Sequence, residues 1–279
     1  MDSPEERVKI AIGEFERLKE YLSSLPPEAW SKPSACDLWE VRDVVAHLAW
    51  SAEFLWPHHS LQGDSSTPEG QPAPGPVTAA SFAEGNAQRA LSRRQSLGDQ
   101  VFSDFKEQHD TMNELMATLG PQEWEKPTYS VSLGIASLRV RLDIRISELV
   151  MHGWDIRSGL EPDAHLSEES LPVFMDMLPA QLERFILRPG PRLPAPIRYR
   201  WELTGAGARN SDVVVEGDKA SVEPAGTGQA DVTFLCDTET FILIAFGRLT
   251  LDAAVAAHRL TIQGEHSLAL EFQRWFPGM

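Results

Sequence analysis

The spacing of apolar residues changes near residue 188 of this 279-residue chain, and that change constrains the fold more than any other feature. Before it, apolar residues recur at three- and four-residue steps, which is typical of amphipathic helices. After it, short stretches alternate apolar with polar residues or run through β-branched ones, as strands do. The stretch 188–196 has four prolines in nine residues and predicts a linker. We therefore expect an α+β protein with two domains, 1–187 and 188–279.

The first domain is predicted to be a four-helix bundle. Its four long helices are expected at 8–25, 38–56, 78–119 and 133–159, with a shorter fifth helix at 168–187. Asp37 is a candidate N-cap for the second helix, and the third is expected to bend near Gly98. Residues 63–76 contain three glycines and four prolines, which predicts a long, lid-like loop. Four long helices with one long crossover are typical of a bundle.

The second domain is predicted to be a small antiparallel sheet with helices on one face. Strand patterns occupy 197–203, 213–216, 221–223, 231–235 and 258–263. Helical patterns occupy 238–246, 251–256 and 267–275.

Composition excludes several classes of partner. The formal charge of −16 would repel nucleic acid and anionic lipid surfaces, so neither is an expected partner. No apolar run approaches the roughly 20 residues that span a bilayer, and the acidic N-terminus does not resemble a signal peptide. Cys36 and Cys236 lie far apart without ligand spacing. That cysteine usage suits a reducing compartment, so we expect a cytoplasmic protein.

Three side chains form a candidate metal site. Glu148 and His152 are four residues apart, so they lie one turn apart on one helix face and could bind the same ion. By itself this spacing arises often by chance and is more commonly a solvated helix pair than a metal site. His47 lies in a helix that is apolar on nearly every side, where it needs a hydrogen-bond partner or a metal. Two imidazoles and one carboxylate would leave a coordination position open, as in catalytic zinc sites, although iron, nickel or cobalt also suit these ligands.

Further polar residues follow the same helix face at steps of four, three, four and three: Arg141, Arg145, Glu148, His152 and Asp155. The two arginines could clamp a substrate carboxylate, or they could form a salt-bridged surface stripe. Asp155 could orient His152. Asp43, one turn before His47, could accept a hydrogen bond from a ligand histidine or an arginine, or cap a turn.

The remaining aromatic and imidazole side chains carry no clear signal. Trp39, Trp50, Trp56 and Trp154 are expected to be core residues rather than a cofactor sandwich. The other histidines lack partner spacing and are expected on the surface or in loops: His58, His59, His109, His165, His258 and His266.

Two N-terminal motifs and one C-terminal stretch carry a family resemblance. They are Trp30-x-x-Pro33-Ser34-x-Cys36-x-x-Trp39-x-Val41-Arg42-Asp43-x-Val45-x-His47-Leu48, then Glu148-x-x-x-His152-Gly153-Trp154-Asp155, and the residues 230–265 with Phe246-Gly247-Arg248. The first two resemble the mycothiol-dependent maleylpyruvate isomerase family, which belongs to the DinB-like metal-binding helical bundles. The third is similar to the sterol-carrier-like domain that the family carries.

The resemblance implies a function and assigns roles. His47, Glu148 and His152 become the ligands of a divalent metal, zinc being the first choice, and Arg248 is the candidate arginine that reaches the site from the C-terminal domain. Because no cysteine lies on the ligand stripe, a sulfur nucleophile would come from a small thiol such as mycothiol. The expected function is an isomerase or S-transferase acting on a small electrophile such as a maleylpyruvate-like unsaturated acid.

Two other functions stay open at this point. One is a metal-dependent hydrolase, for which Asp43 is the remaining candidate base. The other is a non-catalytic protein that binds a small ligand or a lipid. In each case the chain is expected to act as a monomer or a homodimer.

Overall fold

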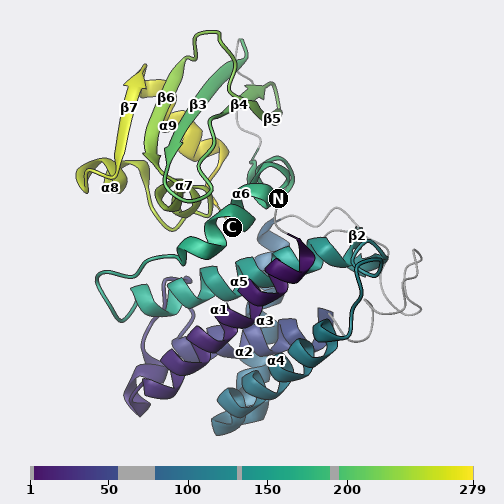
Figure 1. Ribbon diagram of the computed structural model, residues 1–279. Coiled ribbons are helices and arrows are strands. Elements are labelled where there is room, and N and C mark those ends of the chain that lie inside the picture. The colour runs from purple at the N-terminus through teal and green to yellow at the C-terminus, as the bar shows by residue number, and fades with distance from the viewer. Residues whose placement is uncertain (1–2, 56–78, 131–133, 189–194, 279) are drawn as a thin grey trace. The chain divides into compact units, whose positions relative to one another are not determined.

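The computed structural model describes residues 3–55, 79–130, 134–188 and 195–278. The chain forms two compact units, Met1–Ser170 and Leu171–Met279 (Figure 1). Within the described residues, every helix is too short or too polar to cross a bilayer.

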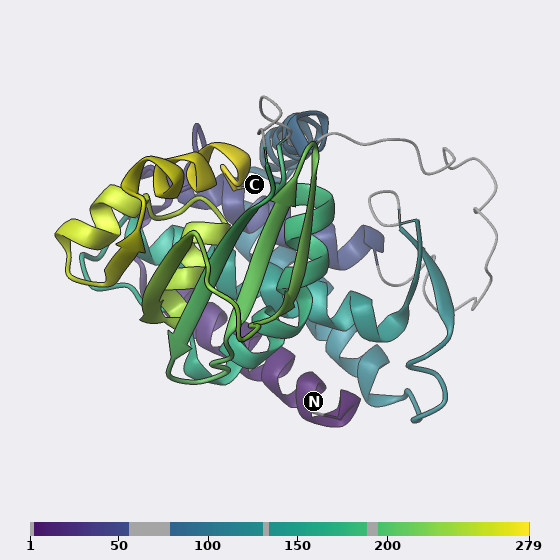
Figure 2. The ribbon, with the colours of Figure 1, turned by 90° about the horizontal axis from the view of Figure 1, so that it is seen from above.

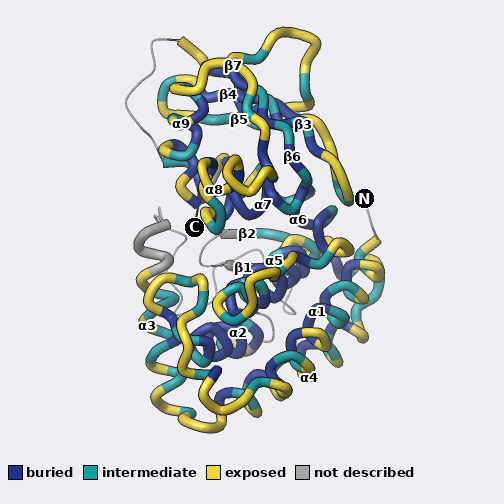
Figure 3. Tube along the Cα trace, turned by 90° about the vertical axis from the view of Figure 1, so that its left-hand side faces the viewer, coloured by how far each residue is buried: buried dark blue, intermediate teal, exposed yellow. Residues whose placement is uncertain are grey.

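The first unit is a four-helix bundle. Its helices are α1 (Pro4–Ser24), α2 (Val41–Leu55), α4 (Val101–Ala117) and α5 (Leu138–Ser158), and α3 (Ala79–Leu97) packs against α2. α1 begins at Ser3, whose side chain forms a capping box with Glu6. A short 3₁₀ turn (Pro27–Ser31) follows α1. Within this unit, α2 and α5 carry long buried stretches, which are dark blue in Figure 3.

The predicted third helix, 78–119, is two helices. A 3₁₀ turn (Gly98–Gln100) separates α3 from α4, and Gly98 has a φ of 53°, a left-handed conformation that glycine adopts without steric cost. The chain therefore breaks there instead of bending.

Two predicted helix starts were also wrong. A hairpin, β1 (Pro127–Ser130) with β2 (Gly134–Ser137), precedes α5, which begins at Leu138 with Ser137 as its N-cap. α2 begins at Val41 and not at Leu38, because Leu38 has a φ of 66°. The expected cap Asp37 is replaced by Asp43, whose Oδ2 accepts from the Glu40 N–H at 2.9 Å.

Two predicted segments lie outside the described residues. They are the loop at 63–76 and most of the proline-rich linker, of which 189–194 are not described.

The second unit is a five-stranded sheet covered by helices on one face (Figure 2). The strands are β3 (Ile197–Thr204), β4 (Ser211–Glu216), β5 (Lys219–Pro224), β6 (Val232–Asp237) and β7 (Leu260–Gly264), in the order β5-β4-β3-β6-β7. The expected antiparallel sheet is wrong for one pair, since β3 and β6 run parallel. The chain leaves the β4–β5 hairpin and crosses to the far side of β3, which reverses the direction of β6 relative to a simple meander.

The helices of this unit are α6 (Leu171–Gln181), α7 (Thr238–Ala245), α8 (Leu251–Ala256) and α9 (His266–Trp275), with a π-helical turn (Leu182–Ile186) after α6. Trp201 of β3 is fully buried; its ring stacks on Phe234 and packs at a tilt against Phe241, with centroids 4.3 Å apart in each pair. The alternation of buried and partly exposed residues along β3 therefore follows the alternation that predicted the strand.

The units divide between Ser170 and Leu171, earlier than the expected boundary at residue 187. The reason is that α6 packs within the second unit, where Phe174 meets Phe246 edge-on with ring centroids 5.6 Å apart.

Candidate metal centre

The facing sides of α2 and α5 bring the candidate ligands together. α2 carries fully buried Val44, Val45 and Leu48, and this apolar surface draws the helix into the bundle core. His47 lies within that surface and is only 3% exposed. Glu148 and His152 lie one turn apart on α5, as their spacing predicted.

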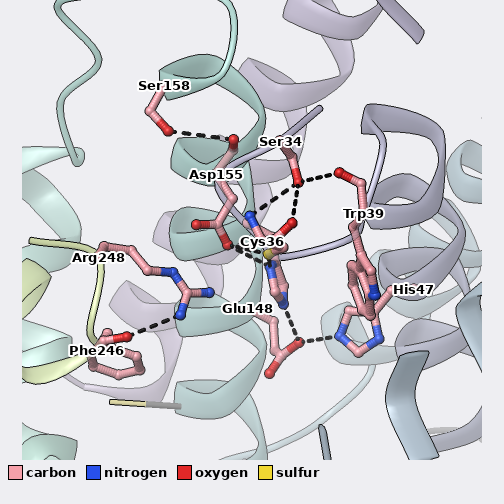
Figure 4. A network of polar contacts seen from close by, with 10 residues as sticks. Ser34, Cys36, Trp39, His47, Glu148, Asp155, Ser158, Phe246 and Arg248 are labelled. Atoms are coloured by element: carbon pink, nitrogen blue, oxygen red, sulfur yellow. Dashed lines mark hydrogen bonds and ion pairs between the residues drawn. The ribbon is translucent and has the colours of Figure 1, made fainter. Parts of the chain in front are cut away.

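The three side chains meet at one point. Nε2 of His47 lies 2.9 Å from Oε2 of Glu148, and Nε2 of His152 lies 3.5 Å from the same oxygen. The two imidazole rings are edge-on with centroids 4.9 Å apart. Figure 4 shows Glu148 reaching from α5 toward His47. The predicted three-residue constellation is thus assembled in the structure.

The donor set fits a divalent ion. One ligand atom from each residue lies within 4.8 Å of the others. In a tetrahedral site with bonds of about 2.1 Å, ligand atoms lie roughly 3.4 Å apart. The 3.5 Å contact already has that spacing, and the 2.9 Å hydrogen bond would open by about half an ångström on binding. About a third of the Glu148 side chain is exposed (31%), which leaves the site open to a small molecule.

The protonation of the cluster follows from burial and its internal hydrogen bonds. Burial alone raises the pKa of Glu148, but hydrogen bonds from His152 and His47 outweigh it and lower the pKa below its ordinary value. Burial lowers the pKa of His47, and the contact with Glu148 only partly opposes it. Burial also disfavours the charged form of His152, but contacts with Cys36, Asp155 and Glu148 outweigh burial and raise its pKa well above the usual range.

Asp155 and Trp39 fix the orientation of the ligands. Oδ2 of the fully buried Asp155 lies 2.9 Å from Nδ1 of His152, in agreement with the expected orienting role. The indole of Trp39 lies against both imidazoles, with centroids 5.2 Å from His47 and 6.1 Å from His152. Trp39 is therefore a core residue that also confines the two ligand rings.

Cys36 also belongs to the site, and the sequence pattern did not place it there. Its Sγ donates to Oδ2 of Asp155 at 2.9 Å and lies 3.6 Å from Nδ1 of His152. Cys36 lies on the loop before α2, so no helical spacing connects it with α5. The one available signal was its position three residues before Trp39 within the first motif.

Arg141 and Arg145 are buried, which rules out the surface-stripe alternative; each is 5% exposed. They line a small pocket together with Glu148, Ser51 and His109. Burial lowers the pKa of Arg141 to about 10 and that of Arg145 to about 9. Within the described part of the chain, Arg145 binds neutral groups: it donates to Asn113 Oδ1 at 2.7 Å and to Met116 Sδ at 3.3 Å, and its Nη2 lies 3.3 Å from His109 Nδ1.

His109 and Asp43 differ from expectation. His109 is not a surface residue: it is 1% exposed and stacks on Phe15, because α4 turns this face into the core. Asp43 contacts neither a ligand histidine nor the α5 arginines in any described interaction. It caps α2 and pairs with Arg94 at 3.0 Å.

Arg248 lies in the second unit. It follows α7, and its Nη1 donates to the Phe246 carbonyl at 3.0 Å. Its part in the site stays a prediction.

Family models match both the N-terminal and the C-terminal part of the chain, and both matches agree with the family that the sequence motifs resemble. Residues 13–157 match the model of the mycothiol maleylpyruvate isomerase N-terminal domain, and residues 197–277 match that of the SCP-2 sterol transfer family. No curated protein matches the sequence.

Two solved structures share the fold over almost the whole chain. One is a crystal structure of the mycothiol-dependent maleylpyruvate isomerase, which is 16% identical in sequence and has a TM-score of 0.61. The alignment covers 95% of this chain and 97% of the isomerase chain. The structure of a histidine-to-alanine mutant of that enzyme is also 16% identical, with the same coverage and a TM-score of 0.62. At this identity the likeness establishes the fold.

Proposed function

Because the chain belongs to the mycothiol maleylpyruvate isomerase family, we propose that it is a metal- and thiol-dependent isomerase or S-transferase. The observation that carries the proposal is the convergence of His47, Glu148 and His152 from two helices on one point. The thiol is mycothiol or another low-molecular-weight thiol, and the second substrate is a small unsaturated acid of the maleylpyruvate type.

His47, Glu148 and His152 would hold the metal, for which zinc is the first choice because two imidazoles, a carboxylate and an open position suit it. A bound divalent ion supplies a position at which a thiol binds and loses its proton near neutral pH. Trp39 confines the imidazoles, and Asp155 keeps the Nδ1 proton on His152.

Arg141 and Arg145 would bind the carboxylate of the electrophile in the pocket beside Glu148. Their buried guanidinium groups also stabilise negative charge that develops on the substrate as the thiolate adds to its double bond. Rotation about the resulting single bond and elimination of the thiolate complete a cis–trans isomerisation. If the adduct instead takes up the proton that the thiol released, addition gives an S-conjugate. Arg248 remains a further candidate for the same electrostatic role.

The two alternatives are less well supported. A hydrolase needs a base for water, and its candidate, Asp43, is engaged by Arg94 and by the Glu40 N–H. A lipid-binding protein needs an apolar cavity in the second unit. There, the buried rings of Phe234 and Phe241 both pack against the buried ring of Trp201, with centroids 4.3 Å away in each case.

The reaction is tested with the zinc-loaded protein, maleylpyruvate and mycothiol, by following the loss of the cis isomer. We expect turnover that requires both the metal and the thiol. Formation of a stable adduct instead would identify an S-transferase. Turnover unchanged when the thiol is left out would refute the proposal. The need for a reduced thiol also leads us to propose the cytoplasm as the compartment, with a monomer or homodimer as the working form.

A further inference from the structure

We infer that Cys36 is a positioning residue of the metal centre. Its thiol and His152 together hold the buried carboxylate of Asp155, which fixes the imidazole that presents Nε2 to the metal. This role rests on the metal centre proposed above, and it gives Cys36 a task other than that of nucleophile or ligand.

One carboxylate oxygen receives both hydrogen bonds. Oδ2 of Asp155 lies 2.9 Å from Cys36 Sγ and 2.9 Å from His152 Nδ1, and Asp155 is fully buried (Figure 4). An ionised carboxylate can only accept, so the thiol and the imidazole Nδ1–H are the donors. Because Nδ1 holds its proton against Asp155, Nε2, which faces Glu148, is the nitrogen that would give up its proton and present a lone pair to a metal.

The loop that carries Cys36 is tied to α5 independently of any ligand. The Ala35 N–H donates to the Asp155 carbonyl at 2.9 Å, and the Cys36 N–H donates to Ser34 Oγ at 3.1 Å. Ser34 in turn donates through its N–H to the Trp39 carbonyl at 2.9 Å. The backbone therefore delivers the thiol to Asp155 in a fixed geometry, and the same segment sets Trp39 against the ligand rings.

The Cys36 thiol lies on the Nδ1 side of the His152 ring, opposite the nitrogen that would bind the metal. Sγ of Cys36 is 3.6 Å from Nδ1 of His152, whereas Nε2 of the same ring points to Glu148. A sulfur at Nδ1 cannot bind the ion that Nε2 binds, since the two nitrogens lie on opposite sides of the ring. Removing the thiol would take a donor from the buried carboxylate oxygen that also binds His152 Nδ1, and would loosen the ring that it holds. Loss of such an outer hydrogen bond typically weakens metal binding about 10-fold or more.

The test measures zinc affinity of the full-length protein by competition with a chromophoric chelator. We expect Cys36→Ala to bind zinc about 10-fold more weakly than the wild type, and Cys36→Ser to stay close to it because the hydroxyl still donates. Cys236→Ala, which removes the thiol of the second unit, is the matched control and should bind normally. If Cys36→Ala does not fold, Cys36→Val fills the same space without a donor and should show the same loss.

Two outcomes would overturn the role of Cys36 alone. One is equal affinity in the wild type and in Cys36→Ala or Cys36→Val. The other is a sulfur-to-cobalt charge-transfer band in the cobalt-loaded wild type that disappears in Cys36→Ser, because that band would make Cys36 a direct ligand. If the wild type bound no metal at all, the proposed metal centre would fail and the role of Cys36 with it.

Discussion

His47 and Glu148, separated by 101 positions in the chain, meet with 2.9 Å between Nε2 and Oε2. The contact joins α2 to α5 at a point where α2 is otherwise buried and apolar. The buried imidazole of His47 needs a hydrogen-bond partner or an ion, and the partly exposed Glu148 provides the partner. His152 approaches the same point, which makes it a candidate site with three ligands. The first prediction follows from that geometry.

Removing any of the three ligands should empty the site. We expect the purified wild type to retain about one divalent ion per chain after dialysis, and His47→Ala, Glu148→Gln and His152→Ala each to retain little, because two protein ligands rarely hold a catalytic zinc. Elemental analysis by mass spectrometry measures the content. His266→Ala, which alters an exposed histidine of the second unit, is the control and should keep its metal. Full retention in both α5 variants would refute the three-ligand site.

Arg145 should matter for activity more than for stability. Arg145→Met removes a buried cation that pairs with no carboxylate in the described structure, so we expect the unfolding free energy to change by no more than about 1 kcal/mol. In contrast, kcat/KM for a carboxylate substrate should fall about 10- to 100-fold, as expected for a lost charged hydrogen bond. Steady-state kinetics and thermal unfolding of the same samples separate the two effects.

The control for Arg145 is a second arginine on the same helix. Arg139 lies in the first turn of α5, pairs with Glu125 at 3.9 Å and is not among the residues that line the pocket, so Arg139→Met should leave kcat/KM unchanged. Arg145→Lys keeps the charge but loses the planar fork and should be intermediate. Normal activity of Arg145→Met toward carboxylate substrates would remove Arg145 from the site.

Local periodicity was sufficient to predict the ligand helix. Residues on one face of a helix recur at intervals of three and four positions. The spacing of Glu148, His152 and Asp155 alone therefore assigns these residues to one face of α5. His47 stood out for a different reason, as a polar side chain in an apolar helix. The bundle class followed from helix number and length.

Features that depend on contacts distant in sequence could not be predicted in this way. Cys36 reaches Asp155 because a loop folds over α5, and no spacing rule describes that path. His109 is buried because of how α4 is rotated in the bundle, and the parallel pairing of β3 with β6 depends on the route between them. Short, partly polar strands such as β1 and β2 carry little periodic signal.

Leu38 should be a site of removable strain. It has a φ of 66° and is 99% exposed. Its Cβ therefore makes the left-handed backbone conformation sterically unfavourable, and its side chain gains no hydrophobic free energy from burial. Leu38→Gly should therefore raise the stability of the first unit by about 1 kcal/mol. Leu38→Ala retains a Cβ and should not. Denaturant unfolding with the metal removed compares the three proteins. A destabilised glycine variant would contradict the prediction, because the backbone entropy that glycine adds to the unfolded chain would then outweigh the relieved strain.

Asp212 should control the acid stability of the second unit. It is fully buried, and Arg200 Nε and Arg198 Nη1 each donate to it at 2.8 Å. The hydrogen bond from Arg200 is the main cause that lowers its pKa to about 2, against the opposing effect of burial. Because the folded-state pKa lies below the ordinary value, the stabilisation is complete above about pH 5 and is lost as the pH falls toward 2.

Replacing this carboxylate should therefore remove a pH dependence as well as stability. Asp212→Asn should destabilise the second unit by about 2 kcal/mol at neutral pH and flatten its stability profile between about pH 5 and pH 2, since the amide cannot titrate. Urea unfolding is carried out at each pH. Pulsed hydrogen exchange of the β3 and β4 amides, always at the same labelling pH, then measures the unfolding of the second unit alone. Asp218→Asn, at an exposed turn, should keep the wild-type profile. An unchanged acid dependence in Asp212→Asn would mean that other carboxylates govern the acid unfolding of the sheet.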